Sequence, residues 1–325
     1  MQHDSENPPS PARRAASLLL AASLIWLALA TLLGFLGRIH WFLDLFAHFR
    51  AQYAAVGLLL AAGLALLRHW RWLAGAAVLT GVNAALLVPL WIGPGAASDM
   101  SEPPLRVFAF NVFAGNSQEN IAAILEQIQK RRPDIVVLLE TRRSAWQDHL
   151  EAPGYELVAH TERNDTFDLA VLSAIPGARA SIQHFTHWNI PAADVRFVWQ
   201  GREVALMAAH PTPPTSTINA RARSEYLREV AEWAGRESVP VIVAGDLNAT
   251  PWSEAFARLL EVGRLENSQR GFGIQPTWCD TCGLMRIPID HVLHSPDLVT
   301  THREVGPSLG SDHSPVYVEL RWRKN

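Results

Sequence analysis

The chain has 325 residues, 49% of them hydrophobic and 18% charged, which is long enough for two structural units. Residues 99–325 hold 22 basic and 28 acidic side chains, a formal charge of −6. That balance argues against a protein that binds nucleic acid non-specifically through its phosphates, because such proteins present a basic face.

The chain begins with a polar, proline-containing stretch, residues 1–14, which we expect to be disordered. Three apolar runs follow, at residues 15–36, 52–67 and 72–92. A run of about 22 residues, at about 1.5 Å per residue, spans a hydrocarbon core of about 30 Å. We therefore predict three transmembrane helices over residues 15–92, the second of which depends on its flanks or on a thinner bilayer.

Two other interpretations apply to these runs. Arg13-Arg14 and the later Ala28-Leu29-Ala30 fit the charged start and the cleavage site of a signal peptide. The first run continues through Leu36, however, and two more runs follow it, which favours an uncleaved span. Three buried helices of a soluble bundle are disfavoured, because no polar stripe interrupts the first or third run.

Basic residues at the ends of the runs predict the orientation. Arg13 and Arg14 precede the first run, and Arg68 and Arg71 separate the second from the third. Because basic loops favour the cytoplasmic side, the region after the third run is expected outside. In a bacterium this means a multi-pass protein of the inner (plasma) membrane, with the lipid bilayer as a partner and a periplasmic or extracellular domain.

Residues 93–104 contain several prolines and glycines and are predicted to be a linker, after which residues 105–325 form an α/β domain. Strands are predicted at residues 105–111, 135–139, 155–160, 168–173, 195–199, 204–209, 241–244, 291–294 and 316–320. Helices are predicted at residues 118–130, 219–233 and 253–260. Short strands that end near polar residues indicate a layered domain with its site along one rim of the sheets.

The most informative stretch is residues 239–251. An apolar run, Val241–Ala244, has the length of a buried strand and stops at Gly245, before Asp246 and Asn248. Side chains two apart on an extended segment point to the same side. A carboxylate and a carboxamide are therefore expected together at the end of a core strand.

Other polar residues also end or begin predicted strands. The full set is Asn111, Glu140, His210, Asp246, Asn248, Asp290, Asp312 and His313. One buried carboxylate is more often an ion-paired or capping residue than a ligand, and one histidine is more often structural. Eight such residues in order along one domain favour a shared functional site. His291 follows Asp290 directly, so its side chain is expected to point away from that site.

The two cysteines, Cys279 and Cys282, form one C-x-x-C motif. In a cytosolic protein this motif indicates redox chemistry or half of a metal site, and no second motif completes a structural zinc site. The other interpretations are a disulfide that tightens a loop, if the domain lies outside the cytoplasm, or two thiols without a role.

With these residues in place, the sequence from Leu105 to Arg321 resembles the endonuclease/exonuclease/phosphatase superfamily of metal-dependent phosphoesterases. The resemblance rests on F-N-V at 110–112, L-L-E at 138–140, A-A-H at 208–210, G-D-L-N-A at 245–249, I-D-H-V at 289–292 and S-D-H-S-P-V at 311–316. It implies a four-layer α/β sandwich of two packed mixed sheets flanked by helices. With three spans ahead, the chain is most similar to the membrane-anchored bacterial branch with teicoplanin-resistance-type proteins, whose implied substrates are undecaprenyl-type lipid phosphates.

The resemblance also implies roles for the eight residues. A hard divalent cation such as Mg²⁺, or Mn²⁺ in its place, is expected on Glu140 and Asp312, with Asn111 binding directly or through water. Asp246 would polarise or deprotonate the attacking water and Asn248 would orient it. His313, held by Asp290, would act as a base or as a cation on the phosphoryl oxygens. His210 is the remaining donor to a phosphate oxygen.

The sequence thus predicts a membrane-anchored, Mg²⁺-dependent phosphoesterase whose substrate is an undecaprenyl-type lipid phosphate or pyrophosphate, or another phosphate ester. One alternative is a Mg²⁺-dependent nuclease acting on DNA, against which the net charge counts. The other is a non-catalytic membrane scaffold, against which the presence of all eight polar residues counts. Oligomeric state stays open.

Overall fold

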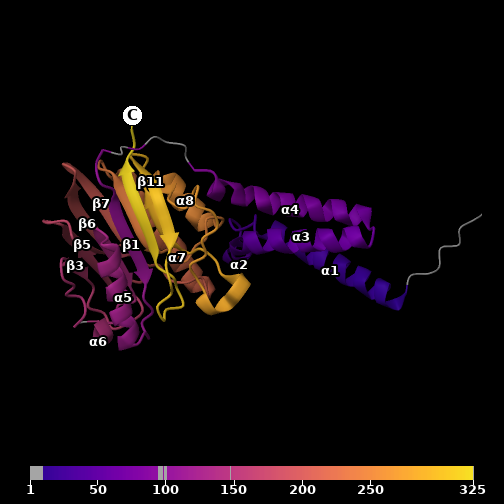
Figure 1. The fold of residues 1–325 in the computed structure, drawn as a ribbon, viewed down its shortest axis with the longest axis horizontal. Helices are drawn as coiled ribbons and strands as arrows, with labels where there is room; N and C mark the ends of the chain where they lie inside the picture. The colour runs from indigo at the N-terminus through magenta and orange to yellow at the C-terminus, as the bar shows by residue number, and fades with distance from the viewer. Residues whose placement is uncertain (1–9, 94–97, 99–100, 147, 325) are drawn as a thin grey trace, which may run out of the picture. The chain divides into compact units, whose positions relative to one another are not determined.

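The structure is a computed structural model and describes residues 10–93, 98, 101–146 and 148–324. Contacts divide the chain into two compact units, Met1–Val88 and Pro89–Asn325. Figure 1 shows the helices and strands in chain order by colour.

The first unit is helical. Its elements are α1 (Pro11–Leu33), α2 (Trp41–Asp44), the 3-10 helix η1 (Leu45–Phe49), α3 (Arg50–Leu66) and most of α4 (Trp70–Trp91). Three helical stretches, at residues 11–33, 41–66 and 70–91, are long and apolar enough to cross a membrane. The three apolar runs of the sequence lie mostly within them. The short helices at residues 41–49 were not predicted, because polar and aromatic residues interrupt the apolar pattern there.

Polar side chains join the three long helices inside this unit. The Arg50 guanidinium donates to the Thr31 carbonyl at 2.9 Å and to the Asn83 side-chain oxygen at 3.3 Å. Asn83 in turn donates to the Thr31 hydroxyl at 2.9 Å. All three residues are buried, so each helix contributes one member to an internal hydrogen-bonded network that fixes their mutual packing.

The second unit contains two six-stranded mixed sheets. The first has the order β11 (Leu298–Val305), β12 (Val316–Trp322), β1 (Leu105–Asn111), β2 (Ile135–Leu139), β4 (Leu169–Ser173) and β3 (Glu156–His160). The second has the order β5 (Arg179–Phe185), β6 (Ile190–Trp199), β7 (Arg202–Ala209), β8 (Val241–Asp246), β10 (Asp290–His294) and β9 (Glu266–Asn267). The helices of this unit are α5 (Gln118–Arg131), α6 (Arg143–Trp146), α7 (Thr217–Arg236), α8 (Glu254–Gly263) and the 3-10 helix η2 (Asp280–Met285).

Three apolar layers hold the two sheets and their helices together. Alternate residues of the central strands, such as Val107 and Val137, fill the space between the sheets with counterparts such as Leu206. The intervening residues of the first sheet pack on α5, and those of the second sheet pack on α7 and α8. This is the predicted four-layer α/β sandwich, and its central strands are apolar on both faces because both faces are covered (Figure 1).

Strand direction brings the polar strand ends to one rim. β1 pairs with β2 in parallel across the helix α5, and β7 pairs with β8 in parallel across the helix α7. β12 and β10 run antiparallel to β1 and β8, so they begin where those strands end. The residues after β1, β2, β7 and β8 and those that begin β10 and β12 are therefore placed side by side.

The predicted strands all exist, and five of them, β6, β7, β8, β10 and β12, extend further than expected. The strand predicted at residues 195–199 begins at Ile190, because Pro191 interrupted the sequence pattern without ending the strand. The predictions missed β5, β9 and β11. β5 and β11 lie at sheet edges and are rich in polar or half-exposed residues, so they lack the apolar runs by which the central strands were identified.

Candidate active site

The site is organised around Asp246, the last residue of β8, whose carboxylate is buried. Its Oδ2 lies 3.2 Å from Asn111 Nδ2, 3.5 Å from His210 Nε2 and 3.6 Å from His313 Nε2. Its Oδ1 accepts a hydrogen bond of 2.9 Å from the Asn248 backbone N–H. Although burial raises the pKa of Asp246, the charge on His313 and the hydrogen bond from His210 lower it more, so the pKa falls below its usual value.

Asn111 and Glu140 occupy the ends of the parallel pair β1 and β2. Asn111 donates through Nδ2 to Glu140 Oε1 at 3.0 Å as well as to Asp246. Glu140 Oε2 accepts from the Ala114 backbone N–H at 3.0 Å, while 16% of the Glu140 side chain stays exposed. The Asn111 amide nitrogen therefore holds the two carboxylates in place, and its Oδ1 accepts from the Phe113 N–H at 3.1 Å. That Asn111 binds a metal, directly or through water, stays a prediction.

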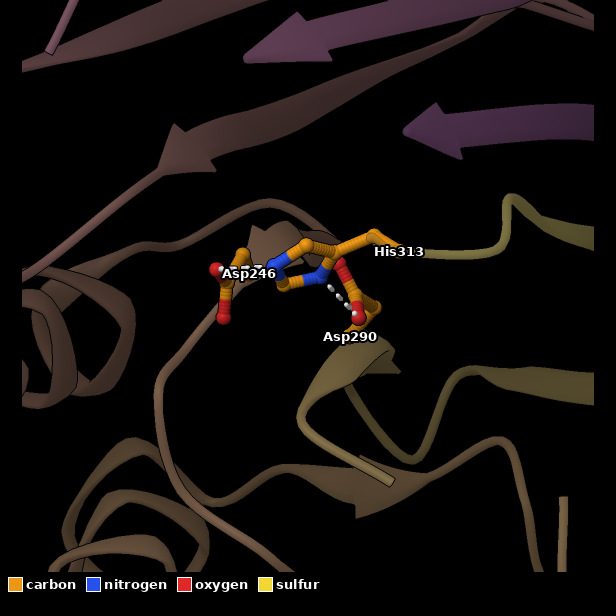
Figure 2. A group of neighbouring side chains, drawn as sticks. All are labelled: Asp246, Asp290 and His313. Carbon is orange, nitrogen blue, oxygen red and sulfur yellow. Dashed lines mark hydrogen bonds and ion pairs between the residues drawn. The ribbon is translucent and has the colours of Figure 1, made fainter. Parts of the chain in front are cut away.

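His313 lies between two carboxylates (Figure 2). Its Nδ1 is 2.9 Å from Asp290 Oδ2, and its Nε2 faces Asp246. Burial lowers the pKa of His313, but the charges of Asp290 and Asp246 raise it more, so the net shift is upward. The imidazole is therefore held as a cation in one orientation, with one nitrogen directed at the centre of the site.

His210 follows β7 and approaches Asp246 from the second parallel pair. Its Nε2 lies 4.0 Å from Glu140 Oε1, and its ring contacts that of Phe167 at 5.7 Å between centroids. Burial lowers the pKa of His210, and the hydrogen bond and charge of Asp246 raise it above its usual value. The buried Nδ1 has no hydrogen-bond partner among the described residues, so the site holds a polar atom still to be satisfied.

Asn248 lies beside Asp246 for a different reason than the one expected. Its φ is +49°, so the chain turns after β8 and the two-residue alternation of a strand does not apply. The turn is closed by the Asn248 backbone N–H on the Asp246 carboxylate. The Asn248 amide nitrogen donates to the Pro211 carbonyl at 3.0 Å, and Arg223 donates to the Asn248 carbonyl at 2.9 Å.

Asp312 stands next to His313 but is held by another segment. Its Oδ2 accepts from the Trp278 indole N–H at 3.0 Å, and its carbonyl accepts from the Asp280 N–H at 2.9 Å. The described part of the chain brings one group of three carboxylates and imidazoles close enough to share an ion, namely Asp246, Asp290 and His313. That group differs from the predicted metal set of Asn111, Glu140 and Asp312.

Several residues that hold the site residues in place were not predicted from the sequence. Thr277 Oγ1 accepts from the backbone N–H groups of Ile289 and Asp290, each at 3.1 Å. Ser311 donates to the Asn111 carbonyl at 2.7 Å and accepts from the His313 N–H at 3.0 Å. The serine before Asp312-His313 was visible as part of a motif. Thr277 and Trp278 carry no signal in the sequence, because loop folding alone brings them to the site.

Asp168 and His291 are structural. Asp168 accepts from the Arg143 N–H and the Thr161 hydroxyl, and it braces the turn that follows Glu140. His291 points away from the cluster, as expected, and its Nε2 lies 2.9 Å from the Ala249 carbonyl. Both residues therefore shape the backbone around the site.

The donor set fits a hard divalent cation on the Glu140 side of the site. A doubly protonated His313 offers no lone pair to a metal, so the Asp246, Asp290 and His313 group is better described as an imidazolium between carboxylates. Glu140 is partly exposed, and its two oxygens keep unshared lone pairs after their single hydrogen bonds. Oxygen donors that leave room for water suit Mg²⁺-like ions.

Comparison with known structures shows the same fold. The chain aligns with the humanized D. rerio TDP2 structure at 18% identity and a TM-score of 0.56, covering 67% of this chain and 98% of that one. It aligns with the human Nocturnin catalytic domain at 19% identity and a TM-score of 0.55, covering 72% and 99%. A mannosyl-6-phosphatase of Bacteroides thetaiotaomicron gives 18% identity and a TM-score of 0.54, covering 67% and 100%.

A search among curated proteins gave no significant match. Residues 108–313, well over half of the chain, match the Endonuclease/Exonuclease/phosphatase family, and this range includes all eight predicted site residues. The chain therefore belongs to the Endonuclease/Exonuclease/phosphatase family, whose members are metal-dependent phosphoesterases.

Proposed function

We propose that this protein is a membrane-anchored, Mg²⁺-dependent enzyme of phosphoesterase type that releases phosphate from a lipid phosphate or pyrophosphate. The observation that supports catalysis is that three N–H groups point at one carboxylate oxygen. Asp246 Oδ2 faces N–H donors from Asn111, His210 and His313, which come from three different strands or loops. An anionic phosphoryl group placed beside this centre would meet the positive charge of His313 and the N–H of His210, which offset the charge that repels a nucleophile.

Carboxylates and imidazoles have different roles in this proposal. Glu140, with Asp312, would hold Mg²⁺, or Mn²⁺ in its place, which supplies positive charge for the phosphoryl oxygens when bound. His210 and His313 donate N–H groups toward those oxygens. Asp246 accepts a proton or a hydrogen bond from the attacking water, and Asp290 keeps His313 in the orientation that this requires. Asn111 fixes the distance between Glu140 and Asp246.

The lipid part of the proposal draws on the rest of the chain. Three helices have the length and composition of membrane spans, and they precede the family domain in the chain. The 13 residues between α4 and β1 reach at most about 45 Å when fully extended, so a bilayer that holds the helices stays near the domain. A phosphatase among the structural neighbours supports phosphate-ester chemistry on this fold.

The direct test is phosphate release from a polyprenyl pyrophosphate by the full-length protein in detergent with Mg²⁺. Asp246→Ala should lower kcat by about 10²–10⁴, the range typical of a lost acid–base group. Asp148→Asn, which changes an exposed carboxylate outside the site, is the control and should retain activity. Equal rates for wild type and Asp246→Ala would refute the hydrolase assignment.

A nuclease is the second candidate, because D. rerio TDP2, a structural neighbour, has been solved with a single-strand DNA product. The formal charge of −6 over residues 99–325 counts against it. A plasmid-nicking assay distinguishes the two. DNA cleavage that weakens steeply with salt would support the nuclease, whereas intact plasmid alongside phosphate release would support the phosphoesterase.

A further inference from the structure

The segment Cys279–Arg286, which we call the 279–286 loop, exposes two large apolar side chains beside the site. Leu284 is 94% exposed, the highest value for a large hydrophobic side chain in the described chain, and Met285 is 51% exposed. Large apolar side chains in the rest of this unit are mostly buried in its three cores. Burial in a core therefore does not explain the two apolar side chains at the tip of this loop.

The loop is nevertheless held firmly. A disulfide joins Cys279 to Cys282, whose Cα atoms are 5.2 Å apart. At one end, the Asp280 carboxylate accepts from the Ser308 hydroxyl at 3.0 Å. At the other end, Arg286 donates to the Ser314 hydroxyl at 2.8 Å. The exposed tip is thus presented on a cross-linked frame.

That frame is built on the catalytic segment itself. The Asp280 N–H donates to the Asp312 carbonyl, and Trp278, just before the loop, donates to the Asp312 carboxylate. Leu284 is two residues from Arg286, a span of at most about 7 Å along the chain. The apolar tip therefore keeps a fixed spacing from His313 and Ser314.

The fixed spacing between the loop tip and the catalytic segment indicates what the tip contacts. Attachment to a bilayer surface needs no particular distance from the reacting atoms, whereas recognition of one substrate does. Arg286 follows Met285 directly, bonds to Ser314 next to His313, and has its Nη1 3.7 Å from Asp280 Oδ1. Apolar side chains next to such a cation match a molecule in which a hydrocarbon chain continues directly from a phosphate group. The cationic and apolar groups follow the same order along the loop as the phosphate and the chain in such a molecule.

We propose that Leu284 and Met285 contact the hydrocarbon chain of the substrate next to its phosphate and so select long-chain lipid phosphates over short ones. This inference rests on the proposed function and adds a specificity-determining element to it. It differs from the site residues in that the two side chains touch no group that changes charge or bonding during hydrolysis.

The test compares allylic diphosphates with 5 and 15 carbons, dimethylallyl and farnesyl diphosphate, in the full-length protein in detergent. Water adds to the terminal phosphorus and the bridging oxygen leaves with the monophosphate, so inorganic phosphate release reports both reactions. In the double variant Leu284→Ser/Met285→Ser, kcat/KM for the 15-carbon substrate should fall about tenfold. The value for the 5-carbon substrate should stay within about twofold of wild type.

Val198→Ser, which removes an exposed apolar side chain from β6, is the matched control and should change neither value. Equal losses on both substrates, or a 15-carbon value that is unaffected, would overturn the inference while leaving the proposed function in place. If wild type hydrolyses neither substrate, both ideas fail.

A binding measurement makes the inference independent of turnover. Calorimetry with farnesyl phosphonate at a concentration below micelle formation should give a dissociation constant about tenfold weaker for the double variant than for wild type. An unchanged constant would overturn the contact even if the rates differed.

Discussion

At the scale of single residues, the catalytic centre depends on one imidazole that is fixed at both nitrogens. His313 Nδ1 is bonded to Asp290 and its Nε2 faces Asp246, so the ring is held in one orientation and the two carboxylates favour its charged form. Asp290 therefore acts through His313, because its carboxylate holds the imidazole at Nδ1.

Asp290→Asn should keep the shape of this contact and remove its charge. His313 would then lose the larger of the two carboxylate charges that raise its pKa, and kcat should fall by about 10²–10⁴ with little change in KM. The activity of the variant should also decline at a lower pH than that of wild type, because the imidazolium loses its proton earlier. Steady-state kinetics from pH 6 to 9 measure both effects, and an unaltered profile would contradict the role given to Asp290.

Gly245 is the residue on which the placement of Asp246 depends. Its φ is +143°, and a Cβ atom there would lie 2.2 Å from the Ala209 carbonyl oxygen, which is backbone and cannot rotate away. β8 can approach the end of β7 this closely only with glycine at this position.

Gly245→Ala should therefore destabilise the domain by about 2–4 kcal/mol, the range of severe single substitutions. Gly201→Ala is the matched control, since its φ is +75° but a Cβ atom there meets nothing within 4 Å. It should cost only about 1–2 kcal/mol for its left-handed backbone. Thermal unfolding of the two full-length variants measures the difference, and equal melting temperatures would refute the steric argument.

At the scale of elements, two strand–helix–strand units share one rim. β1, α5 and β2 supply Asn111 and Glu140, while β7, α7 and β8 supply His210 and Asp246. Each unit delivers its polar residues at the carboxyl ends of parallel strands, where open α/β sheets commonly bind ligands. β10 adds Asp290, whose side chain points toward the site, and His291, whose side chain points to the opposite face of the strand.

His291 links β10 to the turn after β8 and should make the stability of the domain depend on pH. Burial lowers the pKa of His291 to about 3, against about 6.5 in an unfolded chain. The neutral imidazole is therefore favoured by folding. Its contribution is complete above pH 6.5 and is lost as the pH falls toward 3, with a slope of at most about 1.4 kcal/mol per pH unit.

The experiment is thermal unfolding of wild type and His291→Gln between pH 8 and pH 4.5. The variant should be less stable at pH 8, because it loses the contact with Phe256, but its stability should fall less steeply below pH 6.5. Parallel curves for the two proteins would show that His291 does not carry this part of the pH dependence.

At the scale of the whole molecule, an apolar helical unit precedes a family domain that is built as an enzyme. The helical unit has an internal polar network of its own, centred on buried Arg50. The enzyme unit has its own three cores. Each unit therefore has a physical basis for folding, and their covalent connection is what would keep the enzyme near a membrane.

The predicted topology can be measured with reporters that are active only outside the cytoplasm. A fusion after the C-terminus should be active, because three spans that start inside end outside. A fusion after Leu67, in the turn that carries Arg68 and Arg71, should be inactive. The reverse pattern would place the domain in the cytoplasm and would remove periplasmic lipids as substrates.

Much of the fold could be predicted from the sequence because the central strands are continuous apolar runs. Short apolar runs such as Val241–Ala244 are typical of strands in a sheet covered on both faces, and a polar residue after each run marks where that cover ends. The edge strands β5 and β11 could not be found in this way, since half-exposed strands have mixed composition.

The sequence by itself determined the family, the apolar helices and the eight polar residues, because these depend on residue type and order along the chain. Only the tertiary structure decided what those residues do to one another. Asn111 turns its amide toward two carboxylates, Asn248 follows a turn rather than a strand, and Trp278 holds Asp312. Such contacts join segments up to 135 residues apart, and local pattern carries no information on the angle at which two side chains meet.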